Sequence, residues 1–372
     1  MKIGIYNPRV GISDAGGTET FLREMMKRLQ YDHEIILYCG DGEMITQVKD
    51  LSIDIRPISF IRKESYLSST LTRWTPLLPA EVESLSMYWN AKRSGVFDEI
   101  DNYVDVLSTH YYLDNLLVSR SVTTPILFRF PGIKQPSLRW KAMAKFADPD
   151  TYLANSEATA SRLRDWLGLD TDGTVYAGVD EEQFASDTDP AFEDDRVALL
   201  FVGRLDDGKG LGELVEAQSR LGKKTRLYLV GDGTLKSDLQ SKVNDRGLNE
   251  SVRFVGSVPH DEVQQYYAAA DIFCLPSHHE SLGLVNLEAM ATGTPVVTTR
   301  IDAIEEYIND GENGILVPPG DVDALTDALD QLAGDPDLRT RLAAAGRSTA
   351  SQFSWSSQAK KMEAFYEETG SQ

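Results

Sequence analysis

The sequence predicts an α/β protein with two doubly wound parallel sheets in tandem. Short apolar runs alternate with longer amphipathic runs along the chain, which is the pattern of strand–helix–strand units. The length of 372 residues also exceeds one typical core and predicts roughly two domains. An acidic stretch at residues 180–196 contains a proline and lacks periodicity, so we expect it to link the two sheets.

Each half of the chain supplies its own strands and helices. In the first half, strands are expected at residues 2–6, 34–39, 53–57, 104–109, 125–130 and 151–155, and helices at 17–29, 113–120, 138–146 and 157–167. In the second half, strands are expected at residues 197–202, 226–230, 252–255, 272–275, 295–298 and 314–317, and helices at 210–221, 234–246, 261–269, 284–291, 321–333 and 335–352. The carboxyl ends of such strands form the edge where ligands bind.

These elements divide the chain into an N-terminal domain over residues 1–185, a C-terminal domain over residues 186–353, and a final helical segment over residues 354–372. A helix expected at residues 354–368 places Trp355, Met362, Phe365 and Tyr366 near one side. The sequence does not show where this helix docks, and packing back on the N-terminal domain is one arrangement that it allows.

The charge of the chain excludes one class of partner. The 37 Lys and Arg residues stand against 58 Asp and Glu residues, and the net charge is -21. Binding of nucleic acid requires a basic surface that neutralises phosphates, so a nucleic-acid partner is excluded. The excess acid has two interpretations: an ordinary solvated surface, or a halophile-like surface whose dense carboxylates keep the protein hydrated at high salt.

The cellular compartment is predicted from what the sequence lacks. Cys39 and Cys274 are the only cysteines, which excludes a disulfide framework. The first residues have the pattern of a strand rather than of a signal peptide, and no apolar run reaches the roughly 18 residues of a transmembrane helix. We expect a cytoplasmic protein, either free or peripheral on the cytoplasmic face of the membrane.

The most informative segment, residues 279–297, contains Glu280, Gly283 and Glu288. Its pattern predicts a loop that becomes a helix, and the first backbone N–H groups of that helix, at Gly283, Leu284 and Val285, suit a phosphate. Glu280 would then lie just before the helix and Glu288 more than a turn inside it. The two carboxylates can accept hydrogen bonds from a sugar at one end and a ribose at the other, so the ligand indicated is a nucleotide sugar.

A second motif, at residues 203–210, follows the strand expected at residues 197–202. After Gly203, the guanidinium of Arg204 offers a planar fork and Lys209 offers a compact charge. Both suit a pyrophosphate, including the negative charge that develops as a nucleoside diphosphate leaves. The alternative is that these cations simply pair with Asp206 and Asp207 at the surface.

Three weaker signals also lie at expected strand ends. Gly16 and Gly17 follow the first strand, where glycines allow a backbone to approach a phosphate, but the third glycine of a dinucleotide fingerprint is missing. Residues 231–233, in the order Gly-Asp-Gly, have the same ambiguity and are otherwise a tight turn. His110 ends the strand at residues 104–109 and is either a catalytic residue or an ordinary surface imidazole.

No metal site is predicted. His260, His278 and His279 lack cysteine partners at a metal-binding spacing, and Asp-x-Asp pairs are expected by chance in so acidic a chain.

Residues 115–147 invert the charge of the rest of the chain. They contain no Asp or Glu but six cations, Arg120, Arg129, Lys134, Arg139, Lys141 and Lys145. Two interpretations remain: contact with an anionic acceptor or a membrane surface, or an ordinary half-buried helix.

Taken together, the motifs resemble those of retaining glycosyltransferases of the family-4 type, whose GT-B architecture has two Rossmann-like domains facing a central cleft. The resemblance rests on the following motifs, which agree in order and spacing: Glu280-x7-Glu288 with residues 289–297, Gly203-Arg204 with Lys209, Gly231-Asp232-Gly233, and Gly16-Gly17-Thr18-Glu19. It implies a hexosyltransferase that moves a sugar from a UDP- or GDP-sugar to a glycan, lipid-linked or small-molecule acceptor. It also implies retention of configuration, no metal ion, no other cofactor, and an N-terminal acceptor domain with a C-terminal donor domain.

By the same resemblance, each motif residue has an expected role. Arg204 and Lys209 would bind the donor diphosphate, Glu288 the ribose and Glu280 the donor sugar. Gly17 would abut the phosphate or acceptor, and His110 resembles the family's histidine near the reacting carbon.

The chain also departs from the family pattern. Ala177 stands where the family's turn usually has asparagine, and residues 66–89 follow no recognised pattern, which makes them the candidate for acceptor choice. Two rival functions remain: a nucleotide-sugar epimerase of the same fold, and a non-catalytic nucleotide-sugar-binding protein.

Overall fold

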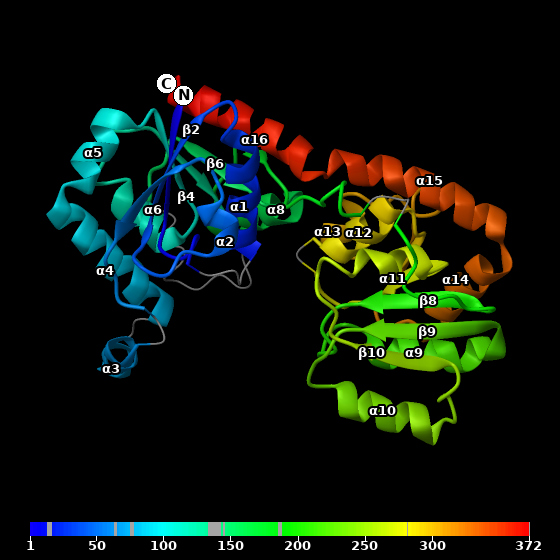
Figure 1. Ribbon diagram of the computed structural model, residues 1–372. Helices are drawn as coiled ribbons and strands as arrows, with labels where there is room; N and C mark the ends of the chain where they lie inside the picture. The colour runs from blue at the N-terminus through cyan, green and yellow to red at the C-terminus, as the bar shows by residue number, and fades with distance from the viewer. Residues whose placement is uncertain are drawn as a thin grey trace. The chain divides into compact units, whose positions relative to one another are not determined.

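The computed structural model describes residues 1–12, 17–62, 65–74, 78–132, 143, 146–184, 188–280 and 282–371. The chain forms two compact units (Figure 1). The first unit comprises residues 1–177 and 358–372, and the second comprises residues 178–357. The boundary expected at residues 185–186 lies slightly beyond this division, and the one expected at residues 353–354 slightly before it.

The first unit is built on a parallel sheet with strand order β3-β2-β1-β4-β5-β6-β7. Its strands are β1 (Lys2–Asn7), β2 (Glu34–Gly40), β3 (Asp54–Ile58), β4 (Val106–Thr109), β5 (Ile126–Arg129), β6 (Thr151–Ala154) and β7 (Gly173–Thr174). The order reverses at β1, which pairs with β2 on one side and with β4 on the other. The loops after β1 and β4 therefore part at this switch point and leave space for a ligand.

Helices cover both faces of this sheet (Figure 1), so its central strands are buried. They are α1 (Gly17–Leu29), α2 (Thr46–Lys49), α3 (Tyr66–Trp74), α4 (Pro79–Ser94), α5 (Val96–Tyr103), α6 (Tyr112–Val118), α8 (Glu157–Leu167) and α16 (Trp355–Gly370), the last joining this unit from residue 358.

The second unit repeats the same topology with strand order β10-β9-β8-β11-β12-β13. Its strands are β8 (Val197–Val202), β9 (Thr225–Val230), β10 (Val252–Gly256), β11 (Ile272–Leu275), β12 (Val296–Thr299) and β13 (Ile315–Val317). Its helices are α9 (Leu211–Leu221), the short 3-10 helix η1 (Gly222–Lys224), α10 (Lys236–Asp245), α11 (Gln264–Ala269), α12 (Leu284–Thr292), α13 (Asp302–Glu305), α14 (Val322–Gly334) and α15 (Pro336–Gln352). Here the switch point lies between β8 and β11. The two predicted parallel sheets are thus confirmed.

The final helix α16 packs on the first unit. The Tyr366 hydroxyl donates a hydrogen bond to Ser108 Oγ in β4, and the Thr369 hydroxyl lies 2.7 Å from that of Thr151 in β6. His33 Nε2 lies 2.8 Å from Glu363 Oε1. These contacts join the end of the chain to three separate parts of the first unit.

Helices α3, α4 and α5 were missed by the sequence analysis. The buried side of α4 includes Val82, Glu83, Ser84 and Met87, and this mixture of polar and apolar residues obscures the helical periodicity. The local signals were present, since Pro79 occupies the first turn and Gly95 follows the helix with φ of 77°. Helix α4 therefore shows that residues 79–89 of the unrecognised segment 66–89 are regular structure.

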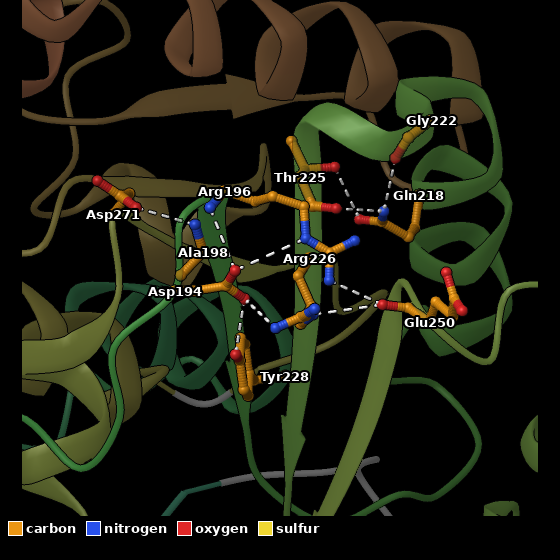
Figure 2. A network of polar contacts seen from close by, with 10 residues as sticks. All are labelled: Asp194, Arg196, Ala198, Gln218, Gly222, Thr225, Arg226, Tyr228, Glu250 and Asp271. Carbon is orange, nitrogen blue, oxygen red and sulfur yellow. Dashed lines mark hydrogen bonds and ion pairs between the residues drawn. The ribbon is translucent and has the colours of Figure 1, made fainter.

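Residues 180–196 do not behave as a free linker where the structure describes them. Phe184 is buried and lies edge-on to Tyr267, while Phe192 stacks on Tyr228 with ring centroids 3.8 Å apart. The carboxylate of Asp194, only 4% exposed, accepts hydrogen bonds from Arg226 Nη1 at 2.7 Å and from the Tyr228 hydroxyl at 2.8 Å (Figure 2). Aromatic and ionic contacts thus fix this acidic stretch to the second unit.

The basic segment at residues 115–147 lies partly outside the described residues, which omit 133–142, 144 and 145. Of its described cations, Arg129 is buried in the first unit, whereas Arg120 Nη2 donates to the carbonyl of Phe146. Among the described helices, none is long and apolar enough to cross a bilayer. Peripheral membrane contact through this segment stays a prediction.

We expect Asp194→Ala to lower the free energy of unfolding by about 2 kcal/mol. It removes the hydrogen bonds from Arg226, from the Tyr228 hydroxyl and from the Arg196 backbone N–H, and it leaves Arg226 without its carboxylate. The matched control is Asp195→Ala, which changes the exposed neighbouring carboxylate. Urea unfolding followed by circular dichroism measures both variants. Equal stability of the two would contradict the anchoring role of Asp194.

Candidate active site

A pocket opens at the switch point of the second sheet, where β8, β9 and β11 end. It encloses about 290 Å³. Its lining comes from the loops after β8, β9 and β10 and from helices near β11, namely Val202, Gly203, Arg204, Val230, Gly231, Asp232, Ser257, Val258, His260, Val263, Val285 and Glu288. Residues predicted from two separate motifs, residues 203–210 and 279–297, are therefore brought together in one pocket.

Close backbone packing shapes the floor of this pocket. Gly231 has φ of 133°, and a Cβ added there would lie 1.9 Å from the carbonyl oxygen of Gly203. A Cβ at Gly233 would similarly meet the backbone of Leu205 at 2.5 Å. The Gly-Asp-Gly turn is thus more than an isolated tight turn, because only glycine lets it lie directly against the loop after β8.

An ion pair joins the two motifs across the switch point. Lys209 Nζ donates to Glu280 Oε1 at 2.7 Å, and both side chains are largely buried. The backbone N–H of His278 also donates to the Gly208 carbonyl at 2.8 Å. The two loops lie so close that a Cβ at Gly210 would collide with the carbonyl of Pro276. The loop after β8 and the loop after β11 are therefore held together by charge and by backbone contact.

Arg204 points its charge toward solvent at the mouth of the pocket. Its side chain is 81% exposed, and Nη1 lies 3.0 Å from Asp206 Oδ2. Hydrogen bonds from the Thr234 N–H and hydroxyl hold Asp206 in place and lower its pKa, which Arg204 lowers further. The surface pairing considered for Arg204 is thus present, and the exposed guanidinium remains in reach of an incoming anion.

Helix α12 begins where the motif at residues 279–297 predicts a helix. Gly283 precedes it with φ of 73°, and Leu284 and Val285 form its first turn. The Tyr307 hydroxyl donates to the carbonyls of Leu282 and Gly283, which fixes the approach to the helix. The N–H groups of such a first turn have no acceptor within the helix and attract an anion.

Glu288 is held from two sides inside the second unit. The buried Tyr267 hydroxyl donates to Glu288 Oε2 at 2.8 Å, and His260 Nε2 lies 3.6 Å from Oε1. The Glu288 carboxylate raises the pKa of His260 and, after burial, also that of Tyr267. Glu288 is thus an oriented hydrogen-bond acceptor that faces the pocket.

His110 and Gly17 belong to the first unit. His110 follows β4 and is fully buried, with Nε2 2.9 Å from Ser108 Oγ. Burial, with a contribution from the nearby Arg129 cation, lowers the pKa of His110 to about 3. Gly17 is the first residue of α1, and Gly16 lies outside the described residues. His110 is therefore not an exposed surface imidazole.

The sequence analysis missed the residues that orient the motif residues. Tyr267, Tyr307 and His260 lie on elements distant in sequence from the groups they contact. No local pattern marks them, because a tyrosine hydroxyl that supports a carboxylate looks like any core tyrosine. Across the described residues, no cluster of three or more His, Cys, Asp or Glu has the arrangement of a metal site.

Comparison with known proteins places this site in a family. Residues 182–349 match the model of the family described as glycosyl transferases group 1, and this range contains the whole pocket and the Lys209–Glu280 pair. The motifs within residues 182–349 thus match a glycosyltransferase family, as the sequence indicated.

Curated relatives agree with this assignment. The chain is 36% identical over 216 residues to the lipopolysaccharide core biosynthesis glycosyltransferase LpsE of Rhizobium meliloti, an alignment that covers 57% of this chain and 62% of LpsE. It is 28% identical to a D-inositol 3-phosphate glycosyltransferase of Frankia alni over 94% of both chains. The first relatives are matched over only 56% to 62% of their own length.

Solved structures share the fold over the full length. HepE of Anabaena, in a structure with UDP, is 20% identical with a TM-score of 0.76, and the match covers 99% of this chain and 100% of HepE. A glycosyltransferase of Rickettsia africae is 20% identical with a TM-score of 0.77, over 99% and 98% of the two chains. The expected GT-B fold class, with two Rossmann-like domains, is confirmed.

The glycine contact at the pocket floor gives one prediction. Gly231→Ala should lower the free energy of unfolding by about 3 kcal/mol, because it combines a strained positive φ with a clash against the Gly203 carbonyl. Gly247→Ala is the control, since Gly247 also has positive φ but nothing within 4 Å of the added Cβ, and should cost about 1 kcal/mol. Equal losses in urea unfolding would show that the close contact is not constraining.

The burial of His110 gives a second prediction. With its pKa near 3, the imidazole should stay neutral between pH 5 and pH 9. In 15N-histidine NMR spectra, the His110 ring resonances, assigned with His110→Gln, should not move over this pH range. A midpoint near the ordinary histidine pKa of about 6.5 would show that the ring is accessible to solvent.

Proposed function

We propose that the protein is a retaining hexosyltransferase that moves a sugar from a UDP- or GDP-sugar to a glycan, lipid-linked or small-molecule acceptor without a metal ion. The observation that carries this proposal is the Lys209–Glu280 pair beside the pocket of Arg204 and Glu288. It puts phosphate-binding cations, a helix N-terminus and two carboxylates at one switch point. A nucleotide sugar carries the matching groups in the order ribose, diphosphate and hexose.

Each residue then has a role in donor binding. Arg204 and Lys209 bind the diphosphate, aided by the first N–H groups of α12 at Gly283, Leu284 and Val285. Glu288 accepts hydrogen bonds from the ribose hydroxyls, and Glu280 accepts them from the sugar. Because Lys209 already pairs with Glu280, its ammonium is oriented before the donor arrives, and the cost of ordering this long side chain is reduced.

The transfer itself needs stabilisation of the leaving group more than a protein nucleophile. The bond between the anomeric carbon and the diphosphate breaks while the acceptor oxygen bonds to the same face of that carbon. The acceptor hydroxyl proton passes to the leaving phosphate oxygen. Arg204 and Lys209 stabilise the charge that develops on the diphosphate.

A pocket in the first unit is the proposed place for the acceptor. It encloses about 280 Å³ at the carboxyl edge of the first sheet. Its lining is mostly apolar, with Leu78, Tyr112 and Met143, but also includes Arg9 and Glu83, whose side chains lie 3.4 Å apart. Residues 78–84 come from the segment that follows no family pattern, which supports a role for this segment in acceptor choice.

A buried carboxyl lies behind the acceptor pocket. Asp114 in α6 is almost fully buried beside Ser84 and Glu83. Burial raises the pKa of Asp114 to about 7, a value that includes the opposing hydrogen bond of Ser84 and a smaller rise from the Glu83 carboxylate. Near neutral pH this carboxyl is thus partly protonated and able to donate as well as accept hydrogen bonds.

The experiment that tests the proposal is a panel of UDP-, GDP-, ADP- and dTDP-sugars, measured by thermal shift and by release of the nucleoside diphosphate. Each is run with EDTA and with Mg²⁺, at low and at molar KCl. A donor at about 100 times its Kd stabilises the protein by about 2.7 kcal/mol, which is a shift of several degrees. UDP-sugars are the first donors to test, since HepE was solved with UDP.

The outcomes separate the proposed function from its rivals. Stabilisation by one donor, with slow release of its diphosphate in EDTA, supports the transferase. Conversion of the donor sugar without diphosphate release would support an epimerase, and tight binding without turnover would support a non-catalytic binding protein. If no nucleotide sugar shifts the melting temperature, the donor site is assigned wrongly.

Lys209→Ala should lower kcat by roughly 10²- to 10³-fold, because the leaving diphosphate loses a stabilising charge. It should also lower the melting temperature, because Glu280 loses its ion-pair partner. Lys223→Ala is the matched control, since Lys223 is exposed in η1 at the other end of α9. Its rates should equal those of the wild type. Wild-type rates in Lys209→Ala would remove Lys209 from the mechanism.

Asp114→Asn should flatten the dependence of stability on pH. The folded state keeps the Asp114 proton up to about pH 7, whereas the unfolded state loses it near pH 4. The stabilising contribution of Asp114 is thus present below about pH 4 and is lost as the pH rises through 7, by up to about 1.4 kcal/mol per pH unit. Urea unfolding from pH 5 to pH 8 compares Asp114→Asn with the exposed control Asp98→Asn; identical slopes would contradict the raised pKa.

A further inference from the structure

Two buried hydrogen bonds, through the hydroxyls of Tyr366 and Ser108, connect helix α16 to His110. The Tyr366 hydroxyl donates to Ser108 Oγ at 3.0 Å, and Ser108 Oγ lies 2.9 Å from His110 Nε2. All three side chains are fully buried. The last helix of the chain thus reaches, through one serine, the ring that follows β4.

A buried cation lies beside this chain of hydrogen bonds. Arg129 ends β5, donates from Nε to the Val175 carbonyl at 2.8 Å, and places its guanidinium 3.6 Å from the centroid of the Phe21 ring. After burial, its charge contributes to the lowered pKa of His110, and it partly opposes the rise that burial causes in the pKa of Tyr366. Among the residues that the structure describes, no carboxylate forms an ion pair with Arg129, so its charge acts on these buried neighbours.

The field of Arg129 orients the hydrogen bonds in one direction. A hydroxyl near a cation turns its oxygen toward the charge and its hydrogen away, which agrees with Tyr366 as the donor to Ser108. Ser108 then accepts from Tyr366 and has its own hydrogen available for His110 Nε2. A ring nitrogen that accepts a hydrogen bond carries no proton, and a neutral imidazole must then carry its proton on the other nitrogen.

We propose that Arg129, Tyr366 and Ser108 hold His110 in the neutral tautomer with hydrogen on Nδ1, so that His110 presents an N–H donor to a substrate oxygen. Nδ1 is buried and has no acceptor among the described residues. A buried donor without an acceptor costs free energy, and a ligand oxygen that enters the site recovers it. Tyr366 and Ser108 are positioning residues in this arrangement.

This tautomer defines what His110 does in the reaction. Because the adjacent cation and burial oppose a second proton, His110 acts as a hydrogen-bond donor and not as a base for the acceptor hydroxyl. That agrees with proton transfer to the leaving phosphate. The catalytic consequence rests on the proposed glycosyl transfer, whereas the tautomer itself does not.

Long-range 1H–15N NMR correlation of 15N-histidine-labelled protein tests the tautomer directly. His110→Gln assigns the His110 signals among the five histidines. In the wild type, Nδ1 should resonate as a protonated ring nitrogen and Nε2 as an unprotonated one. Ser108→Ala should give a mixture of tautomers, and Tyr366→Phe should shift the ring in the same direction by a smaller amount.

Thr369→Val is the matched control. Thr369 is also buried on α16, and its hydroxyl contacts Thr151 rather than the Ser108–His110 pair. This variant loses a buried hydroxyl of the same helix, which contacts Thr151 and the Phe365 carbonyl. Its His110 spectrum should equal that of the wild type. A change in Thr369→Val would show that the His110 signals merely report the packing of α16.

Activity supplies the second readout. Tyr366→Phe should lower kcat roughly three- to tenfold, the size expected for one hydrogen bond, while the KM for the donor stays within twofold. A protonated Nε2 in the wild type, or an unchanged tautomer in Ser108→Ala, would overturn the proposal. If the tautomer is unchanged in Tyr366→Phe alone, Tyr366 is not a positioning residue. Inactivity of the wild type with every nucleotide sugar would instead count against the proposed function, because the NMR result does not depend on turnover.

Discussion

The ion pair between Lys209 and Glu280 joins the two loops that leave the second sheet on either side of its switch point. The strand order separates these loops, because the chain leaves β8 toward β9 on one side and leaves β11 toward β12 on the other. The pair, with the backbone contact between Gly208 and His278, draws them together again. This contact brings the pocket of Arg204 and Glu288 close to the start of α12. The arrangement of charged groups available to a ligand in this unit therefore depends on it.

The sequence predicted the elements whose signals are local. The strand at residues 197–202 and the helices at residues 17–29 and 157–167 match β8, α1 and α8, because buried strands and amphipathic helices carry their own periodicity. Helix α4 was missed because Glu83 and Ser84 lie on its buried side. Pairings such as Tyr267 with Glu288, or Tyr366 with Ser108, depend on residues distant in sequence, and no local pattern encodes them.

The two units share one topology but differ in the charges they place at its switch point. The second unit places Arg204 and Lys209 close to the N-terminus of α12, an arrangement that suits a diphosphate. The first unit instead buries a neutral imidazole at His110, with the Arg129 cation beside it, and a partly protonated carboxyl at Asp114 behind an apolar pocket. In the proposed function, one topology binds a charged donor in one unit and a less charged acceptor in the other, because the loops rather than the sheets differ.

Hydrogen–deuterium exchange of the full chain, with and without UDP, tests the donor site most directly. We expect UDP to slow amide exchange in residues 203–210 and 282–288, with smaller effects at residues 231–233, whose turn packs on the first of these loops. Exchange in β12 and α14, which do not line the pocket, should not change. Protection confined to other segments, or none at a UDP concentration that saturates the protein, would contradict the assignment of these loops to a nucleoside diphosphate.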